Sequence, residues 1–285
     1  MAQATMQSRM QPIQAGPYTL PVHRRTVVMG ILNVTPDSFS DGGRFNQKER
    51  AIQHAQQMVA DGADLIDVGG ESTRPGHQPV SLEEELERVI PVIQALSQAV
   101  DVPISVDTYK AEVARQAVEA GAHIVNDVWG LKKDPEMART VAELDVPVIL
   151  MHNREEARYT SLMEELCHDL MESVHLARTA GVKKERIILD PGIGFAKSYE
   201  ENLTVMQNLE QITDLGFPVL LGTSRKSMIG HTLNLPVEER VEGTGATVTL
   251  GISKGCQFVR VHDVKEMVRV CRMTDAMVQA TGGVE

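Results

Sequence analysis

Short apolar runs alternate with longer amphipathic stretches along almost the whole chain. The apolar runs are rich in valine, isoleucine and leucine and are bounded by glycine or polar residues, which is typical of β-strands. They predict eight strands, at residues 27–32, 65–68, 104–106, 124–125, 146–150, 187–189, 219–221 and 258–261. Elsewhere, apolar side chains recur every three or four residues, and this spacing predicts helices at residues 47–60, 81–99, 111–120, 135–144, 161–179, 200–209, 236–253 and 264–279.

The predicted strands are apolar on both faces, as in the run TVVMGILN, which is the pattern of parallel strands that are covered by helices or closed into a barrel. Successive strands end about 33 residues apart, close to the ~30 residues of one βαβ unit. The 285 residues could form two domains, but no linker or change in composition divides them. Eight such units fit one TIM barrel of about 250 residues. We therefore predict an α/β protein with a single (β/α)8 barrel domain.

The ends of several predicted helices carry signals of their own. Ser81, followed three residues later by Glu84, has the pattern of a capping box at a helix N-terminus. Glycine can adopt the left-handed conformation that ends a helix, and it follows four helical stretches, at Gly62, Gly121, Gly181 and Gly216. Residues 18–26 begin with alternating apolar and polar side chains and predict a short N-terminal hairpin on the barrel floor. We assign residues 1–17 to a flexible lead and residues 18–285 to the barrel domain.

Composition and charge exclude several classes of function. Acidic residues outnumber basic ones by 39 to 28, which gives a net charge of −11, and only 4% of the residues are aromatic. Nucleic-acid binding needs a basic surface and stacking side chains, so we expect no nucleic-acid partner. No apolar run approaches the ~18 residues of a membrane span, and the polar start lacks a secretion signal. An odd number of cysteines without a C-x-x-C pair predicts reduced thiols, and we expect a soluble, cytoplasmic protein without a membrane partner.

Polar residues follow every predicted strand, at the end of the barrel where such folds place their function. They are Asn33, Asp67 with Glu71, Asp107, Asn126 with Asp127, His152 with Asn153, Asp190, residues 223–226, and Arg260 with His262. Any one of them could be polar only because a loop begins there. Asp107, Asp190 and Arg260, however, lie within or beside apolar runs, where an unpaired charge is costly. We therefore expect these three side chains to meet a partner or a ligand.

The loops at these strand ends favour an anionic ligand. Long polar loops at residues 30–43 and 69–76 are placed to cover a site. The glycines of residues 189–197 lack the spacing of a dinucleotide fingerprint, and residues 220–227 lack that of a Walker loop. Lys226, Arg260 and His262 nonetheless put positive charge after the last two strands, where barrels commonly bind phosphate. No zinc-binding histidine spacing occurs in the sequence.

Seven long motifs follow one another between residues 27 and 280. They are MGILNVTPDSFSDGGRF, DVGGESTRPG, SVDTYK, NDVWG, LDPGIGFAK, LLGTSRKS and FVRVHD. Their residues and their order resemble those of the bacterial dihydropteroate synthases. The resemblance implies a (β/α)8 transferase that joins 6-hydroxymethyl-7,8-dihydropterin diphosphate to p-aminobenzoate and releases 7,8-dihydropteroate and pyrophosphate. It also implies a place in folate synthesis, a homodimer, Mg²⁺ as cofactor and inhibition by sulfonamides.

The resemblance assigns residues to each substrate. It places the pterin against Asp107, Asn126, Met151, Asp190, Gly222 and Lys226. It places the diphosphate against Asn33, Arg260 and His262, with Asn33 also a ligand of Mg²⁺. It places p-aminobenzoate against Phe39, Thr73, Pro75, Phe195, Lys226 and Ser227. Carboxylates can accept hydrogen bonds from the amine and ring N–H of a pterin, the amide can both donate and accept, and lysine can donate to the carbonyl.

The chemistry that the resemblance implies needs no activated nucleophile. Pyrophosphate leaves first, and the arylamine then attacks a cationic pterin methylene. Stabilising the negative charge of the leaving group is then the main catalytic effect. The catalytic residues implied are Asp41, Lys226, Arg260 and His262, with Asp41 stabilising the cation. Because Arg260 is assigned to the diphosphate, we expect Arg260→Ala to weaken diphosphate handling more than pterin binding, and Asp190→Asn to do the reverse.

Three other functions compete with this interpretation. A barrel methyltransferase that uses methyltetrahydrofolate would share the pterin-binding Asp and Asn residues, but it would not need the cations Lys226, Arg260 and His262. A family member that binds pterins without turnover is a second alternative, against which the intact loop residues Asp41, Arg74 and Ser227 argue. A purely structural barrel would leave the charges at the strand ends without a purpose.

Overall fold

The structure, a computed structural model, describes residues 10–35, 44–71 and 79–280. Its main strands are β3 (Val27–Asn33), β4 (Leu65–Gly69), β5 (Ile104–Asp107), β6 (Ile124–Asp127), β7 (Val148–Met151), β8 (Ile187–Asp190), β9 (Leu220–Leu221) and β10 (Phe258–Val261). All eight pair in parallel in the order β8-β7-β6-β5-β4-β3-β10-β9. A parallel bridge between Leu189 and Val219 joins the two ends of this sheet. The predicted strands and the TIM (β/α)8 barrel are therefore confirmed.

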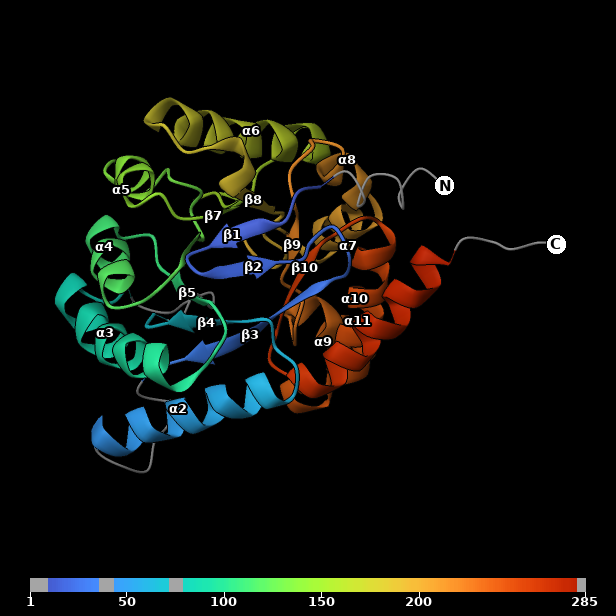
Figure 1. The fold of residues 1–285 in the computed structure, drawn as a ribbon. Coiled ribbons are helices and arrows are strands. Elements are labelled where there is room, and N and C mark those ends of the chain that lie inside the picture. Colours follow the sequence, from blue (N-terminus) through green and yellow to red (C-terminus); the bar gives the residue numbers. More distant parts are fainter. Residues whose placement is uncertain (1–9, 36–43, 72–78, 281–285) are drawn as a thin grey trace.

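Helices surround this sheet on its outer face (Figure 1). They are α2 (Arg44–Ala60), α3 (Leu82–Ala99), α4 (Ala111–Glu119), α5 (Met137–Leu144), α6 (Leu162–Ala180), α7 (Tyr199–Gln207), α8 (Leu209–Thr213), α9 (Ser227–Leu233), α10 (Val241–Ser253) and α11 (Val264–Gln279), with short 3₁₀ turns η2 (Lys184–Arg186) and η3 (Val237–Glu239). The helix predicted at 200–209 ends early because the chain leaves helical geometry at Asn208. The sequence does not predict α9, because its seven residues have too few turns to produce a recognisable apolar period.

Two layers of apolar side chains hold the barrel together. One layer fills the space between strands and helices, and the other fills the inside of the barrel. The inner layer joins strand residues such as Met29, Leu65 and Phe258 to Ile13 and Leu20 of the N-terminal hairpin. The hairpin thus packs against the interior of the barrel at the end where the strands begin, as predicted for a plug on its floor.

The position of this hairpin corrects the predicted boundary. It consists of β1 (Ile13–Ala15) paired antiparallel with β2 (Tyr18–Leu20). Its first strand therefore lies within the range 1–17 that the sequence assigns to a flexible lead. Ile13 and Ala15 are buried while Gln14 is exposed, so the strand has the same alternation as the residues that follow. Such a three-residue strand is too short to stand out in the sequence.

The helix ends follow the predicted signals, with one exception. Gly62, Gly121, Gly181 and Gly216 all have positive φ angles. The Ser81 hydroxyl accepts the N–H of Glu84, but the Glu84 carboxylate pairs with Arg88 instead of returning to the helix start. A complete capping box occurs instead at Ser198 and Glu201. In the part of the chain that the structure describes, no helix is long and apolar enough to span a membrane.

Candidate active site

The guanidinium of Arg260, on β10, forms ion pairs with two carboxylates inside the barrel. Its Nε lies 2.6 Å from Oδ2 of Asp67 on β4, and its Nη2 lies 2.7 Å from Oδ2 of Asp107 on β5. Asn126 on β6 donates from Nδ2 to the same Asp67 oxygen at 3.2 Å. Arg260, predicted for the diphosphate, therefore contacts Asp107, predicted for the pterin. Asp67, which sequence reasoning left out of the site, connects both to Asn126.

This cluster has one cation for two buried carboxylates. Burial raises the pKa of Asp107 to about 7, against the opposing effect of Arg260 and with a further rise from the charge of Asp67. Burial lowers the pKa of Arg260, but the two carboxylates outweigh it and hold that pKa above its ordinary value. Burial therefore favours the protonated form of Asp107, whereas Arg260 stays charged.

Asp190, the last residue of β8, presents a second buried carboxylate. Its Oδ1 accepts the N–H of Gly192 at 2.7 Å. A Cβ atom at Gly222 would lie 3.8 Å from its Oδ2, so the absence of a side chain there leaves space beside that oxygen. Burial raises the pKa of Asp190 to about 6, although the Gly192 N–H and the charge of Lys226 lower it. Met151 pairs in register with Asp190 from β7 and is buried beside it.

Lys226, Phe195 and Ser227 come together from the loop after β8 and the start of α9. The Lys226 ammonium lies 4.2 Å from the centre of the Phe195 ring, which is a cation–π distance. A Cβ atom at Gly194 would lie 3.1 Å from Cδ of Lys226, so the loop crosses the lysine stem closely. Ser227 follows as the first residue of α9 and is exposed. The three residues predicted for p-aminobenzoate in this part of the chain therefore share one edge of the barrel.

The other predicted cations differ in what surrounds them. Ser224 Oγ lies 3.0 Å from Nδ1 of His262 and accepts the His262 backbone N–H at 3.1 Å, so the serine orients the imidazole. Arg225, in the same run as Lys226, instead forms an ion pair with Asp263 at the start of α11, with Nε 2.9 Å from Oδ2. Arg225 is thereby engaged by Asp263, and Arg260 by Asp67 and Asp107.

Asn33, at the end of β3, lies on the same rim of the barrel. A Cβ atom at Gly69 would be 3.7 Å from both Asn33 Oδ1 and Asp107 Oδ2. The amide oxygen of Asn33 therefore lies across Gly69 from the Asp107 carboxylate. No cluster of three or more His, Cys, Asp or Glu side chains that could hold a metal ion occurs among the described residues.

Two polar residues at strand ends serve the protein's own structure. Asp127 accepts the backbone N–H groups of Trp129 and Leu131 at 2.8 and 2.7 Å, and so holds the turn after β6. His152 is buried between Asp169 and Lys197, with ring nitrogens 3.1 and 2.9 Å from them. For these two residues, the interpretation that a strand end is polar for structural reasons is correct.

The structure thus gathers most predicted site residues at one end of the barrel, where Asp67 and Ser224 join them. Asp67 has a signal in the sequence, because it is a charge inside the apolar strand LIDVG. The sequence carries no signal, however, that places Asp67 opposite Arg260. Four predicted residues lie outside the described part of the chain, namely Phe39, Asp41, Thr73 and Pro75.

Comparison of the whole chain with known proteins identifies its family. Residues 29–262 match the model of the family described as pterin binding enzyme. The chain belongs to this family. Within it, the chain is a dihydropteroate synthase, a transferase of folate synthesis.

Two bacterial dihydropteroate synthases are similar over nearly their whole length. That of Clostridium beijerinckii is 60% identical over 259 residues, which is 90% of this chain and 96% of the relative. That of Bacillus subtilis is 58% identical over 282 residues, which is 99% of both chains.

Solved structures of dihydropteroate synthases agree in fold. The Clostridium difficile enzyme, solved in the presence of pteroic acid, is 55% identical with a TM-score of 0.88, over 89% of this chain and 97% of that one. The Xanthomonas albilineans enzyme with 4-aminobenzoic acid is 44% identical with a TM-score of 0.90, over 95% of this chain and 99% of that one. The Yersinia pestis enzyme with a sulfonamide drug is 42% identical with a TM-score of 0.89, over 95% and 100%.

Proposed function

We propose that this synthase binds the dihydropterin ring through Asp107, Asn126, Asp190 and Lys226, with Met151 and Gly222 lining the same pocket. The observation that carries the proposal is that two buried carboxylates, an amide and a lysine meet at one end of the barrel, beside Arg260 and His262. A pterin edge has an amine, a ring N–H and a carbonyl, so it requires acceptors next to donors. Related enzymes were solved in the presence of pteroic acid, in which a pterin is joined to aminobenzoate, and with 4-aminobenzoic acid, one of the two expected substrates.

Catalysis then consists of two steps. The bond between the pterin methylene and the diphosphate oxygen breaks first, and its electrons leave with pyrophosphate. Arg260 and His262 stabilise the negative charge that develops on this group, which is commonly the largest catalytic effect. The amine of p-aminobenzoate next attacks the methylene cation and loses a proton. We place its ring against Phe195, Lys226 and Ser227, and assign Phe39, Thr73 and Pro75 to the same subsite and Asp41 to the cation.

We also propose that Mg²⁺ binds with the diphosphate at Asn33. The site fits this ion because Mg²⁺ keeps several waters and substrate phosphate oxygens and needs only one or two protein ligands. The Asn33 amide oxygen lies on the rim beside the Arg260 cluster. Bound there, the ion supplies positive charge that neutralises the diphosphate. Arg260 and His262 orient the leaving group.

We also propose a cytoplasmic location. The three free thiols, Cys167, Cys256 and Cys271, support such a reducing setting.

The assay that tests this function mixes the purified protein with 6-hydroxymethyl-7,8-dihydropterin diphosphate, p-aminobenzoate and Mg²⁺. We expect equal amounts of dihydropteroate and pyrophosphate, a strong loss of turnover after chelation of Mg²⁺ with EDTA, and inhibition by a sulfonamide. Asn33→Ala should raise the Mg²⁺ concentration needed for half-maximal rate. Pyrophosphate release without dihydropteroate, or turnover that EDTA does not affect, would contradict the proposed chemistry.

We propose a homodimer that forms through the face built by α7, α9, α10 and α11. These helices pack together on one side of the barrel (Figure 1). Large apolar side chains are exposed on them and on η3, namely Leu203, Leu233, Val237, Leu250, Met273 and Met277. Exposed large apolar side chains on helices that pack together support an interaction surface on this side, and a symmetric pair of copies would cover it.

Charging this face should dissociate the dimer. We expect Met273→Glu combined with Met277→Glu to raise the dimer dissociation constant by about 100-fold, because central apolar contacts carry most of an interface's energy. Sedimentation velocity measures the change. Met171→Glu, at a similarly apolar and exposed position on α6, is the matched control and should leave the dimer intact. Dissociation by the control alone would place the interface elsewhere.

A further inference from the structure

Lys197, the last residue of the motif LDPGIGFAK, has no part in the proposed chemistry, yet its ammonium group lies beneath the loop after β8. It contacts the carbonyl oxygens of Gly192 and Phe195 at 3.0 and 3.1 Å and Nδ1 of His152 at 2.9 Å. No carboxylate is among these contacts. An ammonium group has three protons, and the three acceptors match them. Lys197 therefore holds both ends of the turn that carries Phe195.

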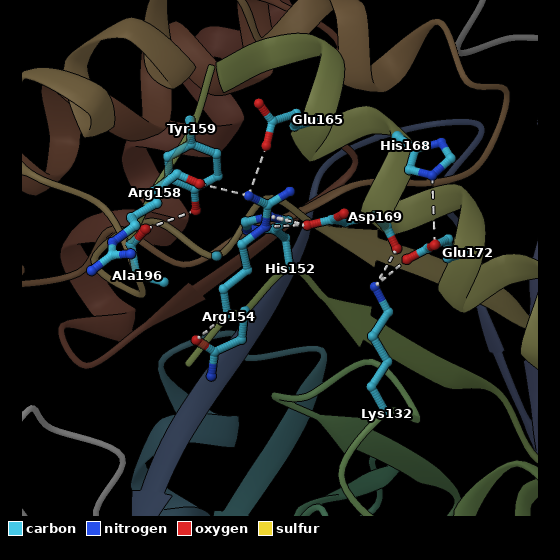
Figure 2. A network of polar contacts seen from close by, with 12 residues as sticks. Lys132, His152, Arg154, Arg158, Tyr159, Glu165, His168, Asp169, Glu172 and Ala196 are labelled. Atoms are coloured by element: carbon cyan, nitrogen blue, oxygen red, sulfur yellow. Dashed lines mark hydrogen bonds and ion pairs between the residues drawn. The ribbon is translucent and has the colours of Figure 1, made fainter. Parts of the chain in front are cut away.

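His152 can serve as an acceptor because of what lies on its other side. Its Nε2 is 3.1 Å from Oδ2 of Asp169 on α6, and Arg154 Nε donates to the same oxygen at 2.6 Å (Figure 2). A proton on Nε2 leaves Nδ1 as the lone-pair nitrogen, which then accepts from Lys197. Burial, with a further contribution from the charge of Lys197, lowers the pKa of His152 to about 3 and keeps the ring neutral.

A second donor holds the same loop from above. Tyr159 donates its hydroxyl to the Ala196 carbonyl at 2.7 Å, and the Arg154 guanidinium lies 4.6 Å from the Tyr159 ring (Figure 2). The carbonyl groups of Gly192, Phe195 and Ala196 thus all accept hydrogen bonds from side chains, the first two from Lys197 and the third from Tyr159. These contacts belong to one network, because Arg154 also pairs with Asp169.

The loop needs such contacts because one of its residues, Ala196, has an unfavourable backbone conformation. Gly192, Gly194 and Ala196 all have positive φ, at 67°, 83° and 44°. For alanine this region costs free energy, and a strained conformation persists only where the surrounding structure holds it. Within the turn, Phe195 presents its ring to the Lys226 ammonium at 4.2 Å. The position of the ring therefore depends on the hydrogen bonds that hold the carbonyl groups of the loop, that of Phe195 among them.

We propose that Lys197 is a positioning residue for p-aminobenzoate, which it serves by holding the Gly192–Phe195 turn so that the Phe195 ring faces Lys226. The inference rests on the proposed placement of p-aminobenzoate at Phe195 and Lys226. The lowered pKa of Lys197, to about 7 because of burial, agrees with an ammonium group that has left water and is held by neutral acceptors.

Steady-state kinetics of Lys197→Met test the inference, because methionine keeps an unbranched apolar stem and removes the three donors. We expect the KM for p-aminobenzoate to rise about 10-fold to 100-fold, since small misplacement of a contact group has effects of this size. The KM for the pterin diphosphate should change less than about twofold. Tyr159→Phe, which removes only the bond to Ala196, should raise the p-aminobenzoate KM by a smaller factor. Lys254→Met is the matched control, because Lys254 pairs with Glu210, and should change neither KM.

Two results would overturn the inference. A merely structural lysine predicts an equal change in both KM values, or no change in either, for Lys197→Met. If that variant does not fold, Tyr159→Phe decides, and an unchanged p-aminobenzoate KM there overturns the inference. Phe195→Ala separates the two proposals. If it leaves the p-aminobenzoate KM unchanged, the proposed subsite is wrong, and Lys197 cannot act through it. If it raises this KM while Lys197→Met does not, only the positioning by Lys197 fails.

Discussion

Arg260→Met is expected to destabilise the protein by about 3–5 kcal/mol near pH 8, because it leaves Asp67 and Asp107 buried without their cation. Turnover should fall by a factor of about 100 or more, because a donor to the leaving group is lost. Urea unfolding measures the first change and steady-state kinetics the second. This expectation revises the one drawn from the sequence, in which loss of Arg260 weakens diphosphate handling more than pterin binding, because Arg260 is bonded to Asp107 of the proposed pterin site.

The pH dependence of the stability of Arg260→Met tests whether the unpaired carboxylates cause its loss of stability. Without Arg260, the pKa of Asp107 rises further above its unfolded value, so the folded state binds more protons than the unfolded state. Stability then decreases as pH rises and recovers as pH falls toward the unfolded pKa near 4. Adding Asp67→Asn to Arg260→Met should recover part of the loss at pH 8, since it removes one unpaired charge.

A matched control uses another arginine that pairs with an aspartate. Arg25 forms an ion pair with Asp64 before β4, and its side chain is 47% exposed. Arg25→Met should therefore cost no more than about 1 kcal/mol. Equal unfolding free energies for Arg260→Met and the native protein would refute the buried cluster as a source of stability.

Asp190→Asn is expected to weaken binding of the free dihydropterin by about 100-fold. The native carboxylate uses Oδ1 to accept the Gly192 N–H, and Oδ2 faces the space beside Gly222. An asparagine that keeps the first bond must turn its NH₂ group toward the ligand, where a donor would oppose the donors of the pterin. A buried polar group left unpaired costs about 1–3 kcal/mol. Calorimetry with a dihydropterin that has no diphosphate measures the loss without the titration of a phosphate.

The pH dependence of the native protein adds a second readout for Asp190. Because burial raises its pKa to about 6, the carboxylate becomes protonated as pH falls through that value and loses an acceptor. Pterin affinity should decrease below pH 6 in the native protein, and this falling limb of the pH profile should be missing in Asp190→Asn. A second decrease in pterin affinity, near pH 7 and caused by protonation of Asp107, should remain in the native protein and in Asp190→Asn.

Asp127→Asn is the matched control for Asp190→Asn. Asp127 also ends a strand, is buried, and has a pKa raised to about 6 by burial. Its carboxylate, however, accepts the N–H groups of its own turn. Asp127→Asn should therefore lower the unfolding free energy and leave the pH limb of pterin binding in place. If it also removed the limb, the assignment of the limb to Asp190 would be wrong.

The barrel could be predicted from the chain because its signals are local. Each strand is a short apolar run between polar boundaries, and each helix repeats its apolar positions over several turns. Features that lack such a period were missed, such as the three residues of β1 and the short helix α9. The motifs in turn indicated the family, since long runs such as LDPGIGFAK lie within single loops.

That polar residues end the strands can be read along the chain, because the strand boundaries and the residues after them are adjacent in sequence. The sequence could not distinguish Asp127, which caps its own turn, from Asp190, whose Oδ2 faces the space beside Gly222, because the difference lies in where each carboxylate points. How the charges pair depends on the folded barrel. Arg260 meets Asp67 and Asp107 across 193 and 153 positions of sequence, and closure of the barrel is what brings β10 against β3 and so within reach of β4 and β5.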